Sequence, residues 1–137
     1  MIECVFCKIV KGSIPAEKIY ETGKILAFLD INAVNKGDAL VITKKHYKEF
    51  IETPDGELAE LIKATRKITE AVGRALKPDG YNILINNKKA AGQVIMHIHA
   101  HIIPRFAGDK VEHWHKKSVP SEELKKMRRE IINELRL

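Results

Sequence analysis

The chain has 137 residues, of which 45% are hydrophobic and 31% are charged, and 24 basic against 18 acidic side chains give it a net charge of +6. This length predicts a single domain, over residues 1–137, that buries about two thirds of its unfolded surface without disulfides. No apolar run approaches the roughly 20 residues of a membrane-spanning helix, which argues against a membrane protein, and the basic surplus favours anionic partners of any kind.

The N-terminal segment, Met1 to Cys4, lacks the basic start and long apolar core of a signal peptide. We therefore expect a cytoplasmic, reducing location, in which Cys4 and Cys7 do not form a structural disulfide. This Cys-x-x-Cys pair has three interpretations: two reduced buried thiols, a redox pair or half of a zinc site. A redox pair is typical of a thioredoxin-like βαβ unit, which the sequence does not predict.

The first half of the chain predicts a short helix followed by strands. Val5 to Val10 predicts the helix, which Gly12 ends. Glu17 to Glu21 and Lys24 to Ile31 predict a β-hairpin. Ala39 to Ile42 is a continuous apolar run, typical of a central strand that is covered on both faces.

The second half predicts two helices and two strands. Thr53-Pro54 predicts a capped helix start, and the following helix, Asp55 to Leu76, carries an apolar stripe that packs on a sheet. Tyr81 to Asn86 and Val94 to Ile103 predict strands, and Ser121 predicts the cap of an amphipathic last helix. This order of elements predicts an α+β fold with a mostly antiparallel sheet.

Three histidines alternate with apolar residues in the last predicted strand. His97, His99 and His101 stand at i, i+2 and i+4, so an extended strand places their imidazoles on one face and the apolar residues on the other. Pro104 is predicted to end the strand. Because imidazoles titrate near neutral pH, this strict alternation indicates a functional site rather than a strand with a polar side.

The pattern from His97 to Ile103, His-φ-His-φ-His-φ-φ with φ apolar, resembles the signature of the histidine triad (HIT) nucleotide hydrolases and transferases. The resemblance covers roughly Val5 to Trp114 and is closest to the Hint-like prokaryotic branch. It rests also on Phe6–Val10, Ala27–Ile31, Val41–His46, Asn86 and Gly92–Gln93. It implies a HIT-like α+β fold and a homodimer that is joined through the long helix and the Tyr81–Asn86 strand.

The resemblance further implies hydrolysis or nucleotidyl transfer at the α-phosphate of a purine nucleotide, with adenosine favoured. Nucleoside phosphoramidates, mixed anhydrides of AMP and dinucleoside polyphosphates all fit this reaction. His99 resembles the nucleophile, and an imidazole suits this role because it is unprotonated at pH 7 and leaves readily once it is bonded to phosphorus. We expect its Nδ1–H to donate to a backbone carbonyl, that of His97.

Other residues take their expected roles from the same resemblance. His101 is expected to contact phosphate oxygens, Gln93 the scissile bridging region and Asn86 the phosphate side. Asp30 is expected to accept hydrogen bonds from the ribose hydroxyls, although it also suits a turn. The base pocket is expected to be lined by apolar residues that would otherwise be ordinary core: Val5, Phe6, Ile9, Phe28 and Ile31.

A structural zinc site is the other implication of the resemblance. Some HIT proteins pair two such cysteines with the first triad histidine and with a histidine that follows an earlier strand. The matching residues are Cys4, Cys7, His46 and His97. Two thiolates and two imidazoles complete a tetrahedral Zn²⁺ site, which stabilises the fold, and no cofactor is required for catalysis.

Two alternatives remain open from the sequence. In one, the triad binds a catalytic metal, although the outer Cα atoms of such a strand lie roughly 13 Å apart. In the other, the chain is a non-enzymatic nucleotide-binding protein; nucleic acid is a poor candidate because the basic residues are scattered and there is no aromatic platform. The identity of the leaving group is not determined by the resemblance. Some Hint-like members carry a hydroxyl residue where this chain has Val94, and Lys88-Lys89 make the preceding loop unusually basic.

The segment after the triad strand carries one further feature. Trp114 resembles a tryptophan that reaches toward the partner's active site in Hint-like dimers, and its neighbours His113 and His115 are expected to lie on the surface.

Overall fold

A computed structural model, which describes residues 3–135, contains a five-stranded antiparallel sheet in the order β1-β2-β3-β5-β4. Met1 and Ile2, the start of the segment compared with a signal peptide, lie outside the described residues. The strands are β1 (Lys18–Glu21), β2 (Ile25–Leu29), β3 (Ala39–Thr43), β4 (Gly80–Leu84) and β5 (His99–Arg105). The helices are α1 (Val5–Lys11), α2 (Asp55–Leu76) and α3 (Ser121–Glu134), with a 3₁₀ turn, η1 (Lys89–Ala91). The predicted α+β architecture is confirmed.

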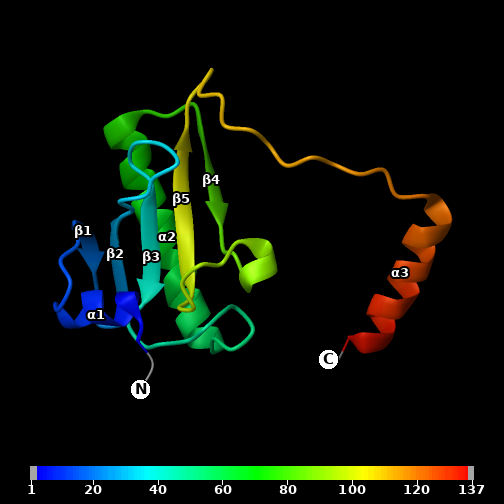
Figure 1. The fold of residues 1–137 in the computed structure, drawn as a ribbon, viewed down its shortest axis with the longest axis horizontal. Helices are drawn as coiled ribbons and strands as arrows, with labels where there is room; N and C mark the ends of the chain where they lie inside the picture. Colours follow the sequence, from blue (N-terminus) through cyan, green and yellow to red (C-terminus); the bar gives the residue numbers. More distant parts are fainter. Residues whose placement is uncertain (1–2, 136–137) are drawn as a thin grey trace.

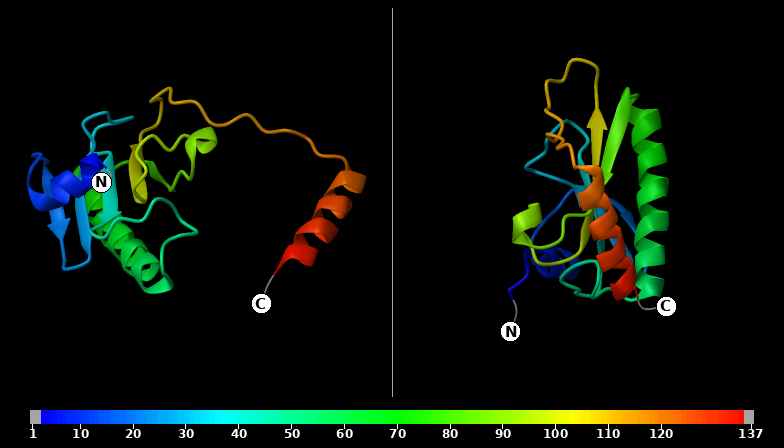
Figure 2. Two further views of the ribbon diagram at one scale, coloured as in Figure 1. Left: turned by 60° about the horizontal axis from the view of Figure 1, so that its bottom comes forward. Right: turned by 90° about the vertical axis from the view of Figure 1, so that its right-hand side faces the viewer.

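The sheet is covered on both faces (Figures 1 and 2). On one face, Leu61 and Ile68 of α2 pack on alternate residues of the strands, such as Val41. On the other face, Phe6 and Ile9 of α1 pack on the residues in between. Because both faces are covered, all five residues of β3 are buried, as its continuous apolar run predicted.

The triad strand differs from its prediction at both ends. Strand β5 begins at His99, so that Val94 to Ile98 form an irregular segment before it. Pro104 lies inside β5 and does not end it. The Arg105 carbonyl points toward β4, where it accepts from the Asp79 N–H. In a strand the backbone groups of successive residues point to alternate sides, so the Pro104 nitrogen points away from β4 and toward β3. On that side the pairing with β3 has already ended, and the missing N–H therefore breaks no ladder bond.

The two predicted helix caps are wrong in detail. The residue before α2 is Pro54, which has no side-chain cap, and the Thr53 hydroxyl donates to the Glu49 carbonyl at 2.8 Å instead. Ser121 is the first residue of α3 and follows Pro120, again without a side-chain cap. In both helices a proline with extended backbone stands at the position where the sequence predicted a hydroxyl.

Helix α3 lies apart from the sheet at the end of a long extended segment (Figure 1). None of its residues is buried, and its apolar stripe is exposed, with 56% of Leu124 and 62% of Ile131 accessible. Among residues 3–135, no helix combines the length and apolarity that crossing a membrane requires.

Candidate active site and the Cys/His cluster

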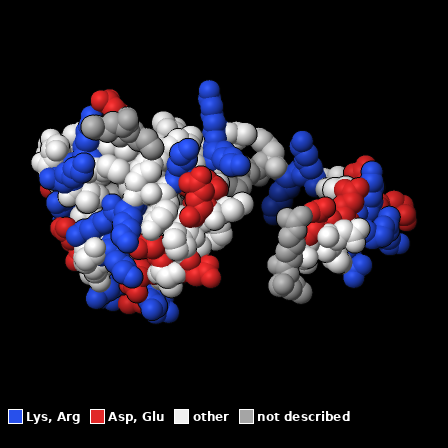
Figure 3. Space-filling view, turned by 90° about the horizontal axis from the view of Figure 1, so that it is seen from below, with Lys and Arg blue, Asp and Glu red and all other residues white. Residues whose placement is uncertain are grey.

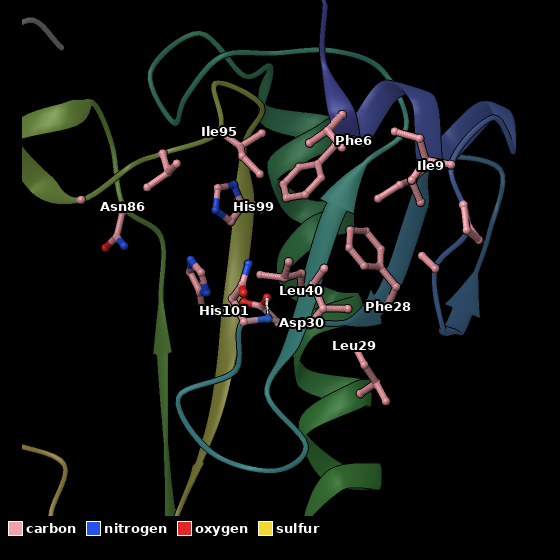
Figure 4. Close-up of a pocket in the computed structure, with 18 residues that line it drawn as sticks. Phe6, Ile9, Phe28, Leu29, Asp30, Leu40, Asn86, Ile95, His99 and His101 are labelled. Atoms are coloured by element: carbon pink, nitrogen blue, oxygen red, sulfur yellow. Dashed lines mark hydrogen bonds between the residues drawn. The ribbon is translucent and has the colours of Figure 1, made fainter.

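A cavity of about 450 Å³ opens between α1, the ends of β2 and β3, and β5 (Figure 4). One end is apolar, with Phe6, Ile9 and Phe28, and all five residues expected to line a base pocket line the cavity: Val5, Phe6, Ile9, Phe28 and Ile31. The other end carries the polar residues Asp30, Asn86, His99 and His101. The cavity therefore has the division that a nucleotide needs, with a flat apolar part beside a polar part.

The position of α1 creates the apolar end. The Phe6 ring packs edge-on against the Phe28 ring, with centroids 5.5 Å apart, and edge-on against His99 at 5.2 Å. Ile14, Ala16 and Leu40 also line the cavity, and the sequence analysis missed them. No local pattern marks them, because they come to the cavity only through the packing of α1 and of the β2–β3 pair.

The orientation of the His99 ring is set by a backbone group two residues earlier in the chain. The ring Nδ1 lies 2.7 Å from the carbonyl oxygen of His97. A carbonyl only accepts, so Nδ1 carries the proton and Nε2 holds the free electron pair, as the sequence predicted. Burial lowers the pKa of His99 below its ordinary value of 6.5, and this effect outweighs the opposing effect of the hydrogen bond to the His97 carbonyl. The imidazole is therefore mostly neutral at pH 7, with the electron pair of Nε2 free.

His101 lies next to His99 on the same face of β5, with ring centroids 4.8 Å apart. Burial lowers its pKa as well, while the Asp30 carboxylate opposes this shift. Asn86 faces the cavity from the other side, where Figure 4 shows it across from His101. Gly92 has φ of 94°, and a Cβ there would lie 3.6 Å from the Asn86 amide nitrogen, so the glycine gives the loop its turn beside Asn86.

Asp30 combines both interpretations that the sequence left open. Its Oδ1 accepts from the Asn32 N–H at 2.8 Å, which stabilises the turn after β2. The same side chain lines the polar end of the cavity. A carboxylate accepts up to about four hydrogen bonds, so the turn leaves acceptor positions for a ligand.

Gln93 does not line the cavity. Its side chain is buried, its Oε1 accepts from the Lys88 N–H at 2.7 Å, and its Nε2 donates to the carbonyls of Lys48 and Ile95 at 2.6 and 3.0 Å. The amide thus holds the loop from Lys88 to Ile95 against the segment that follows β3. The geometry supports a role in positioning this loop rather than the expected contact with the scissile bond.

A second cluster forms where α1 begins. Cys4, Cys7, His46 and His97 bring one ligand atom each within 4.8 Å of one another. The Nδ1 atom of His97 lies 3.3 Å from the Cys4 Sγ, 3.6 Å from the Cys7 Sγ and 3.2 Å from the His46 Nδ1. The ligands of a tetrahedral ion with bonds of about 2.0–2.3 Å lie at similar separations.

The hydrogen bonds around His97 suit a metal ligand. Its Nε2 lies 2.6 Å from the Thr43 carbonyl, so Nε2 carries the proton and the electron pair of Nδ1 points into the cluster. Burial and the neighbouring Cys4 raise the pKa of the Cys7 thiol to about 11, so that a cation is needed to ionise it at pH 7. The four residues are able to hold a metal ion.

The triad therefore splits between two sites. His97 turns toward the cysteines, whereas His99 and His101 face the cavity. Within residues 3–135, the three rings do not form a common group of ligand atoms. This geometry gives no support to a catalytic metal held by the triad.

The comparisons with known proteins agree with this arrangement. The family pattern described as "HIT domain" matches residues 11–108. The chain belongs to the HIT family. It is 46% identical over 104 residues to an adenosine 5′-monophosphoramidase of Schizosaccharomyces pombe, covering 76% of this chain and 75% of that protein. It is 44% identical over 107 residues to an adenylylsulfatase of Arabidopsis thaliana, covering 78% of this chain but only 54% of that protein.

Solved structures confirm the fold of this HIT protein. A HIT family protein of Bacillus subtilis matches with a TM-score of 0.92 and 37% identity over 99% of both chains. A zinc-bound histidine triad family protein of Mycobacterium smegmatis matches with a TM-score of 0.76 and 38% identity over 95% of this chain and 93% of that one.

The role of Gln93 is open to a direct test. Gln93→Met keeps the volume but removes the side-chain partners of three backbone groups, so it should lower the free energy of unfolding by about 1–3 kcal/mol. Urea unfolding measures this loss. The control removes an exposed amide, since Asn32→Ala should leave the stability nearly unchanged. A stable Gln93→Met protein with low activity would contradict the positioning role.

Proposed function

We propose that this HIT protein hydrolyses purine nucleotides, with adenosine favoured, at the α-phosphate through a covalent nucleotidyl intermediate on His99. The observation that carries the proposal is the 2.7 Å contact between His99 Nδ1 and the His97 carbonyl, which leaves the electron pair on Nε2. Two relatives named for the cleavage of adenosine phosphoramidate and of adenylyl sulfate support it.

The reaction has two balanced steps. In the first, the Nε2 electron pair of His99 bonds to phosphorus, and the bond from phosphorus to the leaving group breaks with its electrons going to that group. The imidazole then carries a positive charge, which the His97 carbonyl stabilises through the Nδ1–H. In the second, water bonds to phosphorus and its proton passes to the released leaving group or to solvent. The P–N bond breaks with its electrons returning to Nε2, so the nucleoside monophosphate leaves neutral His99 behind.

Substrate orientation follows from the division of the cavity. The base lies between the apolar side chains of α1 and β2, and Asp30 accepts from the ribose hydroxyls. His101 and Asn86 then face the α-phosphate and donate to its oxygens, which gain negative charge in the transition state. Phosphoramidates, mixed anhydrides of AMP and dinucleoside polyphosphates all place their leaving group on the open side, beside the loop that carries the exposed Lys88 and Lys89.

A role as a nucleic-acid-binding module has less support. On the face seen in Figure 3, basic and acidic side chains are interspersed and form no continuous basic surface. The most exposed large aromatic residue among residues 3–135, Trp114 at 83%, stands by itself and offers no stacking platform.

The nucleophile assignment predicts a clear order among the variants of the two cavity histidines. His99→Asn should abolish turnover while AMP binding stays within about tenfold, or roughly 1.4 kcal/mol, because the base pocket and Asp30 are unchanged. His101→Ala should slow a reaction that stays measurable. Intact-mass measurement with a slow substrate should detect the nucleotidyl adduct on the wild type and not on His99→Asn. Turnover by His99→Asn would refute the assignment.

We also propose that the Cys/His cluster binds structural Zn²⁺ in a reducing, cytoplasmic setting, in which both thiols stay available to the metal. Both cysteines are free in the structure. The ion ties the start of α1 to the segment before β5, and so to the carbonyl that orients His99. Zinc supplies charge that ionises the two thiols, and it takes no part in the reaction.

Metal analysis tests the zinc proposal. The purified protein should contain one zinc per chain, and His46→Ala should lose it and melt at a lower temperature, whereas the exposed His113→Ala should keep it. Because the ligands bind zinc in their deprotonated forms, stability from the metal should fall as the pH is lowered, together with zinc content. A protein that contains no zinc and takes up none when it is offered would contradict the proposal.

We further propose a homodimer joined through α2 and β4. Strand β4 is an edge strand, and an unpaired edge is a ready site for association. Ile62 of α2 and Tyr81 and Ile83 of β4 are about half exposed. Ile83 and Tyr81 pair with Ile102 and Pro104, which places them on the α2 side of the sheet. A second copy covers these apolar side chains and continues the sheet.

Sedimentation tests the dimer. The wild type should sediment as a dimer at micromolar concentration, and Ile83→Glu should shift it to a monomer because a charge is then buried at the joint. Ile19→Glu, on β1 at the opposite edge of the sheet, should leave the dimer intact. A monomeric wild type at this concentration would rule the interface out.

A further inference from the structure

Asp38 is a buried carboxylate that the proposed reaction does not use. Its side chain is only 2% exposed. One oxygen, Oδ2, accepts from the Val34 N–H at 3.0 Å, whereas Oδ1 is buried without a hydrogen-bond partner among the described residues. An unpartnered buried oxygen of this kind is costly, so its presence calls for a ligand that the oxygen binds.

The strand register places Asp38 beside Asp30 and His101, which line the polar end of the cavity. Leu40 of β3 pairs with His101 of β5, so both side chains lie on the same face, and Asp38 lies two residues before Leu40 on that face. The Asp30 N–H donates to the Asp38 carbonyl at 3.0 Å, which continues the β2–β3 pairing and places the two aspartates opposite each other. One ligand atom each of Asp30, Asp38 and His101 therefore lies within 4.8 Å of the others.

The charges at this point do not balance within the protein. Burial, together with the nearby Asp30, raises the pKa of Asp38 to about 6. The Asp38 carboxyl lies beside that of Asp30, and none of the ion pairs among residues 3–135 includes either of them. Two neighbouring carboxyl groups beside an imidazole attract a cation, because like charges this close repel each other unless a proton or a metal ion is shared between them.

We propose that Asp30, Asp38 and His101 form a second metal site, which binds one divalent cation of the Mn²⁺ class at the ribose–phosphate end of the cavity. Carboxylate oxygens with a single imidazole suit Mn²⁺, whereas the Cys/His cluster, with two thiolates, suits zinc. The remaining positions around the ion belong to water. This site goes beyond the proposed function, since the attack by His99 needs no ion.

The ion has one structural consequence for the reaction. A cation on one ring nitrogen of His101 requires the proton to be on the other, which makes that second nitrogen an N–H donor. Such a donor is what a phosphate oxygen needs. The site thus sets the tautomer of His101 and offsets the two carboxylates beside the nucleotide phosphate.

Titration with Mn²⁺ tests the site in the full chain. The protein is first loaded with zinc, so that the Cys/His cluster is filled, and free Mn²⁺ is then followed by its solution EPR signal without nucleotide. The wild type should bind one Mn²⁺ per chain. Asp38→Asn, which keeps the shape and removes the charge, should weaken this binding at least about tenfold, since it replaces one of the two carboxylate ligands by a neutral amide. Asp55→Asn, the same change at an exposed position of α2, should not.

Asp30→Asn is the second variant, and it should cause a similar loss of Mn²⁺ binding even if Asp38→Asn fails to fold. Absence of Mn²⁺ binding by the zinc-loaded wild type would overturn the proposal, as would binding that neither aspartate variant weakens. Because nucleotide is absent, these outcomes are independent of whether His99 forms the nucleotidyl intermediate.

Discussion

The hydrogen bond from His99 Nδ1 to the His97 carbonyl is the contact on which the rest of the site depends. It fixes the tautomer of the proposed nucleophile and the direction of its free electron pair. A backbone carbonyl serves well here because it does not titrate and its position is set by the chain itself. His97 is in turn held by its side chain, between the Thr43 carbonyl and the two cysteines. One residue therefore links the Cys/His cluster to the reactive nitrogen.

Burial is the second determinant of the chemistry. Helix α1 covers the face of the sheet that carries His99, and Phe6 contacts the rings of both His97 and His99. This cover forms the apolar end of the cavity and also keeps the neighbouring imidazoles neutral, since it lowers their pKa values. The same packing therefore forms the pocket proposed for the base and keeps the proposed nucleophile unprotonated.

Much of this could be predicted from the sequence because it depends on local periodicity. The alternation of His97, His99 and His101 predicts one shared face, and the apolar run from Ala39 predicts a central strand. The bounds of α2 match the prediction, because its apolar stripe and the prolines on either side of it are local signals that define where a helix begins and ends. The resemblance, together with this periodicity, also led us to expect the residues of the base pocket, the four residues of the Cys/His cluster and the tautomer of His99.

The tertiary structure decided what depends on residues far apart in the chain. Pro104 can continue β5 because the pairing of β5 with β3 has already ended at that position. The Gln93 side chain hydrogen-bonds backbone groups, one of them the carbonyl of Lys48, far away in the chain. Asp38 stands just before the apolar run of β3, and only the pairing with β2 buries it opposite Asp30 and near His101. Burial and strand register are properties of the assembled sheet, whereas a sequence pattern carries only the order of residues along one strand.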